Sequence, residues 1–188
     1  MVNLNSDLTT EIKNLLDEKF SGSDMALKFL ERLKKGKLTR DENPKSHFCV
    51  YFAAYDPRAK QIFIGHHKKS GLWLFNGGHI DKGERINGTL MREIDEEWGL
   101  KGNDFEIKPP ALITIAEINN STKQPCNFHY DLWCFISVDK NSFAPVELKL
   151  SEEFYEIGWK KLEEARNLIK KDKITLLAID FIENNYFK

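Results

Sequence analysis

The sequence has few cysteines and no arrangement of them that indicates a crosslinked or zinc-bound framework. Its 188 residues include three cysteines, Cys49, Cys126 and Cys134. An odd number without closely spaced pairs argues against a disulfide framework and against a zinc site. Cys49 and Cys134 lie in apolar runs typical of strands, where a free cysteine acts as a small hydrophobic side chain. We therefore expect a reducing, cytoplasmic location.

Long apolar runs and an excess of charge of one sign are also missing. No uninterrupted apolar stretch approaches the roughly 20 residues of a membrane-spanning helix. The first residues have neither the basic nor the apolar segment of a signal peptide. The formal net charge is −1, whereas nucleic-acid-binding proteins carry an excess of Lys and Arg. We expect neither a membrane nor a nucleic acid as a partner.

The composition and length indicate a globular protein built around one main domain. With 188 residues, 41% of them hydrophobic, the chain is long enough to bury a substantial core. We place an N-terminal helical extension in residues 1–40 and the main domain in residues 41–188. Apolar spacing in residues 5–35 predicts two helices separated by residues 21–23. They contain no residues with recognisable chemistry, so we expect a packing role, with a homodimer interface as an open alternative.

The main domain alternates between strand and helix patterns, which predicts an α/β fold. Strands are expected at 47–55, at 60–66, at 105–118 with an interruption near Pro109 and Pro110, and at 128–138. A loop is expected at 119–127, a loop leading into a short strand at 147–159, and helices at 162–169 and 174–187. In the strand at 128–138, strict alternation places His129 and Asp131 on one face. There we favour a structural pair over a catalytic one.

The most informative stretch is an acidic helix preceded by a glycine-rich turn, in residues 77–100. Residues three and four apart on a helix are neighbours, so Glu93, Glu96 and Glu97 are expected to point into one small volume. Glu93 and Glu97 lie beside the apolar stripe of this helix, whereas Asp95 lies on its far side. Unpaired buried carboxylates are costly, so we predict a divalent cation, and oxygen ligands suit Mg²⁺. A solvated acidic helix face is the alternative.

This stretch resembles the Nudix box, whose pattern is GX5EX7REUXEEXGU, with U a bulky aliphatic residue. All seven fixed positions match, with Gly78, Glu84, Arg92, Glu93, Glu96, Glu97 and Gly99. The box itself runs from Gly78 to Leu100, and the order of strands around it agrees over residues 45–165. The resemblance implies a Nudix-type α/β/α sandwich with a mixed β-sheet, preceded here by the N-terminal helical segment.

The resemblance also implies a set of metal ligands. Glu93 and Glu97 would bind Mg²⁺ directly, Glu96 would complete the cluster, and Gly78 would offer its carbonyl oxygen. Mn²⁺ is an alternative ion.

Asn87 is a candidate N-cap for the acidic helix.

Further box residues are implied to support catalysis. Arg92 and Glu84 resemble supporting residues, since a guanidinium can hold two carboxylates at once; taken alone, Arg92 would be an ordinary surface residue. A carboxylate must accept a proton from the attacking water. We expect a box glutamate to do so with Glu153 assisting, and Glu152 is a close alternative. The candidate catalytic residues are Glu84, Arg92, Glu93, Glu96 and Glu153.

Residues just before the box are candidates for binding substrate. His67 and Lys68 lie in a basic loop that could contact phosphates or could be a solvated turn. Trp73 and Phe75 could stack on a base, although aromatic residues at strand spacing are more often core. Asn76 stands where relatives often have proline, so the rim of the pocket is expected to differ.

Three functions are compatible with the resemblance. The first is Mg²⁺-dependent hydrolysis of a phosphoanhydride bond in a nucleoside diphosphate linked to another moiety. The second, a Nudix-fold isomerase of isopentenyl diphosphate, is disfavoured because the catalytic cysteine motif is missing. The third is a non-catalytic nucleotide-binding or regulatory module. Substitution of box glutamates would have indicated such a module, and no box glutamate is substituted. We predict the first, with a small nucleotide-type substrate.

Overall fold

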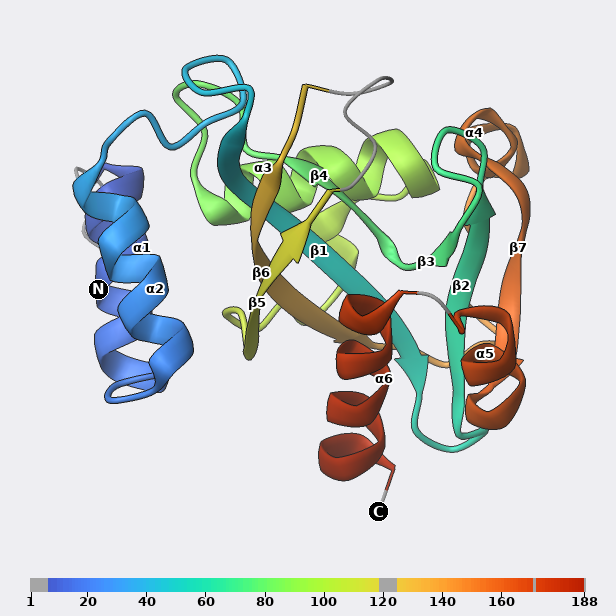
Figure 1. The fold of residues 1–188 in the computed structure, drawn as a ribbon. Coiled ribbons are helices and arrows are strands. Elements are labelled where there is room, and N and C mark those ends of the chain that lie inside the picture. Colours follow the sequence, from blue (N-terminus) through green and yellow to red (C-terminus); the bar gives the residue numbers. More distant parts are fainter. Residues whose placement is uncertain (1–6, 119–124, 171, 188) are drawn as a thin grey trace.

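The protein folds into a mixed β-sheet between two helical layers, as the sequence predicts. The computed structural model describes residues 7–118, 125–170 and 172–187. The strands are β1 (Ser46–Asp56), β2 (Gln61–His67), β3 (Trp73–Leu74), β4 (Asn76–His79), β5 (Leu112–Glu117), β6 (Phe128–Ser137) and β7 (Phe154–Lys161). Figure 1 shows helices on both sides of this sheet, with the N-terminal pair along one side.

Six α-helices surround the sheet in the described part of the chain. They are α1 (Leu8–Lys19), α2 (Asp24–Lys34), α3 (Ile86–Glu93), α4 (Glu147–Glu153), α5 (Leu162–Leu168) and α6 (Lys173–Tyr186). A π-helical turn, η1 (Ile94–Trp98), continues α3, and a short 3-10 turn, η2 (Gly102–Asp104), follows it. In the described ranges no helix has the length and apolar character required to cross a membrane.

Strand β1 organises the sheet because both of its edges are used. The parallel strand β6 pairs with β1 from Ser46 to Tyr55 along one edge. Along the other edge, β4 pairs antiparallel with residues 49–52 and β2 with residues 55–56. The order β3-β2-β1-β6-β5, with β4 beside β1 and β7 beside β2, therefore combines parallel and antiparallel pairs. This pairing places the beginning of the glycine-rich box against the middle of β1.

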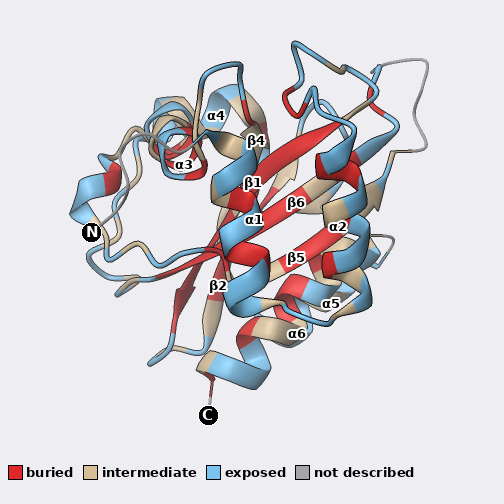
Figure 2. Ribbon diagram, turned by 90° about the vertical axis from the view of Figure 1, so that its left-hand side faces the viewer, coloured by how far each residue is buried: buried red, intermediate tan, exposed pale blue. Residues whose placement is uncertain are grey.

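Two hydrophobic cores lie on the two faces of the sheet. Alternate residues of β1, such as Val50 and Phe52, share a core with α1, α2 and α3, whereas Ala53 and Tyr55 share the other core with α5 and α6. The same alternation holds in β6, as the sequence predicts. Figure 2 shows buried residues concentrated along the strands behind α1 and α2. The sheet is therefore covered on both faces, as expected for a domain of this class.

The two N-terminal helices are separated at residues 21–23, as the sequence predicts, and they pack on the sheet. The hydroxyl of Ser23 accepts a hydrogen bond from the N–H of Ala26 at 3.1 Å and so caps α2. Phe29 is fully buried among residues of β1 and β6. The buried Arg32 donates to the carbonyl oxygens of Gly36 at 2.8 Å and Lys37 at 2.7 Å. A division of the chain at residue 40 stays a prediction.

Two elements differ from the sequence-based expectation. The strand expected at 105–118, with an interruption near Pro109 and Pro110, forms only beyond that interruption, as β5, and residues 105–111 form no strand. The two prolines have no N–H to donate to a neighbouring strand. The segment expected to begin as a loop at residue 147 instead forms α4, whose sequence is rich in good helix formers. Of the loop expected at 119–127, residues 119–124 lie outside the described residues.

Candidate active site

The glycine-rich turn brings the box close to β1. Gly77 has φ of 146°, and a Cβ atom there would lie 2.5 Å from the carbonyl oxygen of Val50. Only glycine fits such a position. Helix α3 then begins after Arg85, so the candidate N-cap Asn87 lies inside the helix. A carboxylate oxygen of Glu11, on α1, instead accepts the N–H of Ile86 at 3.2 Å.

Arg92 links several acids of the box. Its guanidinium donates to both carboxylate oxygens of Glu84, at 2.8 and 3.0 Å, to Glu93 at 2.7 Å and to Glu96 at 3.0 Å. It also donates to the carbonyl oxygen of His79 at 2.9 Å. The hydrogen bonds from Arg92 lower the pKa of Glu84 to about 2, so Glu84 stays charged. A fork of this geometry fixes the orientation of the acids that it binds.

Glu93 is buried directly beneath the backbone of β4. The residue is 7% exposed, and a Cβ atom on Gly78 would come within 2.0 Å of its Oε1 atom. Burial raises the pKa of Glu93, and the charge and hydrogen bond of Arg92 oppose that shift. The missing side chain at Gly78 is therefore what lets the carboxylate reach the strand.

Glu97 approaches the beginning of β4 from the π-helical turn. Its carboxylate accepts hydrogen bonds from the side-chain amide of Asn76 and, at 3.4 Å, from the N–H of Gly77. Burial raises the pKa of Glu97 to about 8, and the nearby charge of Glu93 adds to the effect. The side-chain oxygen of Asn76 is buried and has no hydrogen-bond partner within the described residues. Two acids and an unsatisfied amide oxygen thus gather at one end of β4.

The three glutamates of the helix do not converge as tightly as α-helical geometry predicts. Glu96 is exposed and bound to Arg92, whereas Glu97 turns towards Asn76. Among the described residues, no group of three His, Cys, Asp or Glu ligand atoms within 4.8 Å of one another includes a box glutamate. The reason is the wider π-helical turn, which changes the angle between successive side chains and is common at functional sites.

The candidate residues outside the box lie around the junction of α4 and β7. Glu153 contacts Nζ of Lys69 at 3.0 Å and Nε2 of His67 at 3.4 Å. Although burial opposes it, the hydrogen bond and charge of Lys69 lower the pKa of Glu153. The ammonium of Lys68 binds the carbonyl oxygen of Ser151. His67 and Lys68, which are predicted to contact substrate phosphates, therefore both interact with other groups of the protein.

The two aromatic candidates have different surroundings. Trp73 is half-buried and stacks against His66, with ring centroids 5.7 Å apart, and Nζ of Lys160 lies 5.4 Å from its ring centroid. Phe75 is fully buried and packs edge-to-face against Trp133, with centroids 6.0 Å apart. The position of Phe75 favours the core alternative, whereas Trp73 is only partly buried.

Sequence reasoning missed residues that come from distant parts of the chain. Glu11 has no local signal that connects it to α3. His79 directly follows the box glycines, and its burial and the neighbouring His129 lower its pKa to about 3. Among the described residues the predicted pair of His129 and Asp131 is not hydrogen-bonded: Oδ2 of Asp131 accepts from the hydroxyl of Thr114 at 3.0 Å, whereas its Oδ1 and both ring nitrogens of His129 have no partner there. Packing of α1 brings Glu11 to α3, whereas strand register brings together the strand residues His79, His129 and Asp131.

Comparison with known proteins identifies the family. A family model described as the NUDIX domain matches residues 44–179. Two similar proteins, from Escherichia coli (strain SE11) and Shigella flexneri, are both named nucleoside triphosphatase NudI. Each is 31% identical to this chain over 97 residues, which is 50% of this chain and 64% of the relative. The match thus spans less than two thirds of the relatives' own length.

Solved structures show the same fold at low sequence identity. The E. coli dihydroneopterin triphosphate pyrophosphohydrolase aligns with a TM-score of 0.60 at 15% identity, over 74% of this chain and 94% of that one. A NUDIX family hydrolase from Clostridium perfringens aligns with a TM-score of 0.53 at 19% identity, over 73% and 98%. Sequence, fold and the Arg92-centred acids agree, and the chain belongs to the NUDIX family.

Proposed function

We propose that this protein is a Mg²⁺-dependent hydrolase that cleaves a phosphoanhydride bond in a nucleoside diphosphate linked to another moiety. A further phosphate is the simplest such moiety, which makes nucleoside triphosphates the first substrates to test. The observation that supports this most directly is the buried carboxylate of Glu93, placed against the backbone of Gly78 and held by Arg92. A buried acid in that position is suited to bind a cation next to the strand.

The donors at this site fit an oxygen-preferring ion. Glu93 and Glu97 are acids with raised pKa values, which is the expected state of buried carboxylates without a bound cation. The side-chain oxygen of Asn76 has no partner in the described part of the chain, and a Cβ atom on Gly78 would collide with the carboxylate of Glu93. Carboxylate and carbonyl oxygens are the ligands that Mg²⁺ takes, and Mn²⁺ accepts the same set. We place the ion among Gly78, Glu93, Glu96 and Glu97.

The other residues would orient, bind and accept a proton. A divalent ion, when bound, neutralises diphosphate charge and activates water for attack on phosphorus. Arg92 holds Glu93 and Glu96 in place, and Glu84 fixes the guanidinium from its other side. We assign proton acceptance to a box glutamate, with the ionised Glu153 assisting.

Substrate contacts are proposed for the rim formed by β3 and the preceding loop. Trp73 offers a partly exposed ring for a base, and Lys68 and His67 lie nearby along the chain. Lys68 would have to leave the carbonyl oxygen of Ser151 in order to bind phosphate, which predicts a modest rather than a large contribution. The relatives named nucleoside triphosphatase support a triphosphate as the ligand of this rim.

A substrate panel tests the proposal. Purified protein would be incubated with nucleoside triphosphates, deoxynucleoside triphosphates, dinucleoside polyphosphates and sugar nucleotides, with Mg²⁺ or with Mg²⁺ replaced by EDTA. We expect hydrolysis of at least one class with Mg²⁺, near-complete loss with EDTA, and recovery when Mg²⁺ is restored. Nucleotide binding without turnover across the whole panel would contradict the proposal and favour the non-catalytic alternative. A homodimer and a cytoplasmic location stay predictions, and light scattering after gel filtration measures the first.

A further inference from the structure

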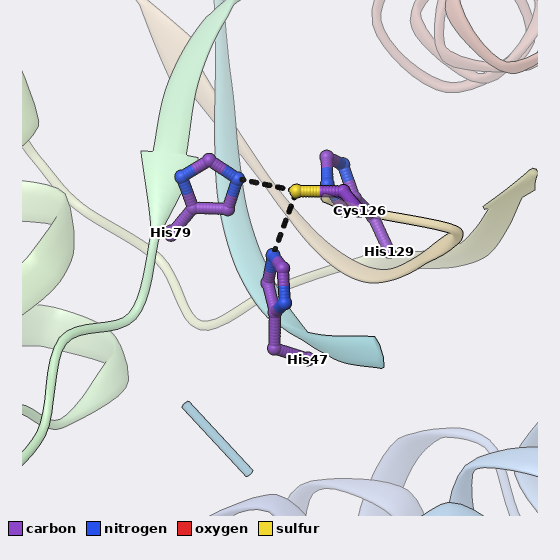
Figure 3. Close-up of side chains that lie close together, drawn as sticks. All are labelled: His47, His79, Cys126 and His129. Carbon is purple, nitrogen blue, oxygen red and sulfur yellow. Dashed lines mark hydrogen bonds between the residues drawn. The ribbon is translucent and has the colours of Figure 1, made fainter. Parts of the chain in front are cut away.

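Four potential metal ligands gather on the face of the sheet opposite α3. They come from the beginning of β1, the end of β4, the residue two places before β6, and β6 itself. We name them the His/Cys cluster, which consists of His47, His79, Cys126 and His129. Each residue offers one ligand atom, and these four atoms all lie within 4.8 Å of one another. Figure 3 shows the sulfur of Cys126 directed towards the rings of His79 and His47, with His129 beside it.

Strand register assembles the cluster. His47 and His129 are directly paired in the parallel strands β1 and β6, and His79 is paired with Cys49 across β4 and β1. The three ring centroids are 4.7, 5.0 and 5.1 Å apart, so each imidazole is close to both others. Three rings at nearly equal separations around one sulfur atom leave the centre of the group surrounded by ligand atoms.

The hydrogen bonds of the cluster leave its nitrogen lone pairs available. Nδ1 of His47 lies 3.0 Å from the carbonyl oxygen of Asn43, so Nδ1 carries the hydrogen and Nε2 has a free lone pair. That Nε2 atom lies 3.8 Å from the sulfur of Cys126. His129 is 6% exposed, and neither of its ring nitrogens has a hydrogen-bond partner in the described part of the chain. Buried polar groups normally have partners, so these nitrogens indicate a missing ligand.

We propose that the His/Cys cluster binds one Zn²⁺ ion in a closed tetrahedral site. Zinc–nitrogen and zinc–sulfur bonds of about 2.1 and 2.3 Å require nitrogen and sulfur ligands to lie about 3.6 Å apart. The distances from the sulfur to His47 and His79, 3.8 and 4.0 Å, need only a small contraction to reach that value. Imidazole and thiolate donors suit Zn²⁺, whereas Mg²⁺ requires oxygen ligands.

A second group of neighbouring side chains, Cys49, His129 and Asp131, shares His129 with the cluster. It is the weaker candidate because it offers three ligand atoms, and one of them belongs to His129 of the cluster. The His/Cys cluster also supplies four protein ligands rather than three. Four ligands leave no open position, which is the arrangement of structural zinc sites.

The proposed ion would stabilise the position of β4, the strand that carries Gly77 and Gly78. His79 contributes its ring to the cluster and its carbonyl oxygen to Nη2 of Arg92, at 2.9 Å. Binding would hold β4 against β1 and β6 from the face opposite Glu93. It would also hold Cys126, which belongs to the segment entering β6. The inference does not depend on the substrate or the activity proposed above.

Metal content and cobalt spectroscopy test the site. The full-length protein would be purified without chelators, dialysed in buffer containing Mg²⁺, and analysed for zinc, copper, nickel and iron. We expect about one zinc per chain. After exchange with Co²⁺, we expect a sulfur-to-cobalt charge-transfer band in the near ultraviolet, because Cys126 supplies a thiolate. The thermal midpoint of unfolding should rise on addition of Zn²⁺.

Matched cysteine variants make the test specific. Cys126→Ser should lose the charge-transfer band and retain less than one tenth of the zinc, whereas Cys134→Ser, a buried cysteine outside the cluster, should keep both. If Cys126→Ser does not fold, His129→Gln serves instead and should lower zinc retention at least tenfold. Wild-type protein without stoichiometric zinc and without the cobalt band would overturn the proposal. Retention of the band in Cys126→Ser, or stoichiometric copper, nickel or iron in place of zinc, would overturn it as well.

Discussion

The two faces of β4 carry opposite kinds of chemistry a few ångströms apart. On the α3 face, Gly78 meets the carboxylate of Glu93, and charged oxygen and guanidinium groups dominate. On the other face, the ring of His79 meets neutral imidazoles and a thiol. The first group is contiguous in the sequence, whereas the second joins residues from positions 47 to 129. A local motif thus defines one face, and strand register alone defines the other.

The largest expected effect lies on the charged face, at Glu97. Glu97→Gln keeps the shape of the side chain but cannot ionise to balance a bound cation, so hydrolysis should fall by about 10²–10³-fold, as for other removals of preorganised charge. The free energy of unfolding should change little. The control is Asp95→Asn, which removes a charge from an exposed position of the same turn. Initial rates with Mg²⁺ and urea unfolding curves measure both, and wild-type turnover in Glu97→Gln would refute the site assignment.

The next-largest effect is expected at Gly78, where the carboxylate of Glu93 lies directly against the backbone of β4. In Gly78→Ala the added Cβ atom would lie 2.0 Å from Oε1 of Glu93, so either the acid or the strand must move. We expect a loss of about 2 kcal/mol in stability, typical of overpacking, together with lost activity. In Gly88→Ala, on α3, the added carbon would meet no described atom within 4 Å beyond its chain neighbours and the helix's own backbone, so this variant should be neutral or slightly stabilising. Equal unfolding midpoints for the two variants would contradict this.

Arg92 is expected to have a smaller effect, exerted through the acids that it positions. Arg92→Lys keeps the positive charge but cannot contact Glu84, Glu93 and Glu96 together, so the rate should fall about tenfold. The matched control is Arg166→Lys on α5, which also lies between two acids but far along the chain from the box. The apparent affinity for Mg²⁺ is the second readout. Equal losses in both variants would show a general effect of the substitution.

The smallest expected effect concerns Asp56, a buried residue that belongs to neither face of β4. Asp56 accepts backbone N–H groups of Arg58, Ala59 and Lys140 at 2.8–2.9 Å, and although burial opposes it, these hydrogen bonds lower its pKa. Its contribution to stability is therefore present above the unfolded pKa of about 3.9 and is lost as pH falls through the lower folded value.

Asp56→Asn should accordingly lower the free energy of unfolding by about 1 kcal/mol at pH 7. The difference from wild type should shrink below about pH 4. Unfolding curves at several pH values check this, with the exposed Asp17→Asn as control. A difference that grows on acidification would contradict the assignment.

The sequence predicts the fold well because its signals are local. Alternation along β6 depends on neighbouring residues and appears in the structure as expected, and the spacing of the box, which is also local, predicts the family that the NUDIX model identifies. The start of α3 was not predictable, because Glu11 approaches it from a helix some 75 residues earlier. The direction of the Glu97 side chain was not predicted, because an α-helical projection assumes a constant rotation per residue and Glu97 lies in a π-helical turn. The His/Cys cluster was not predicted, because the number and spacing of cysteines do not show that strand pairing brings three histidines next to Cys126.

The long parallel pairing of β1 with β6 has a further consequence. Ten consecutive residues of β1 are matched to β6, from Ser46 to Tyr55. A shift of one residue would turn every side chain of β1 to the opposite side. His47 would then enter the hydrophobic layer beneath α1 and α2, and Val50 would leave it. The alignment of these two strands therefore keeps the nitrogen and sulfur atoms of the His/Cys cluster on the opposite side of the sheet from the carboxylates of the box.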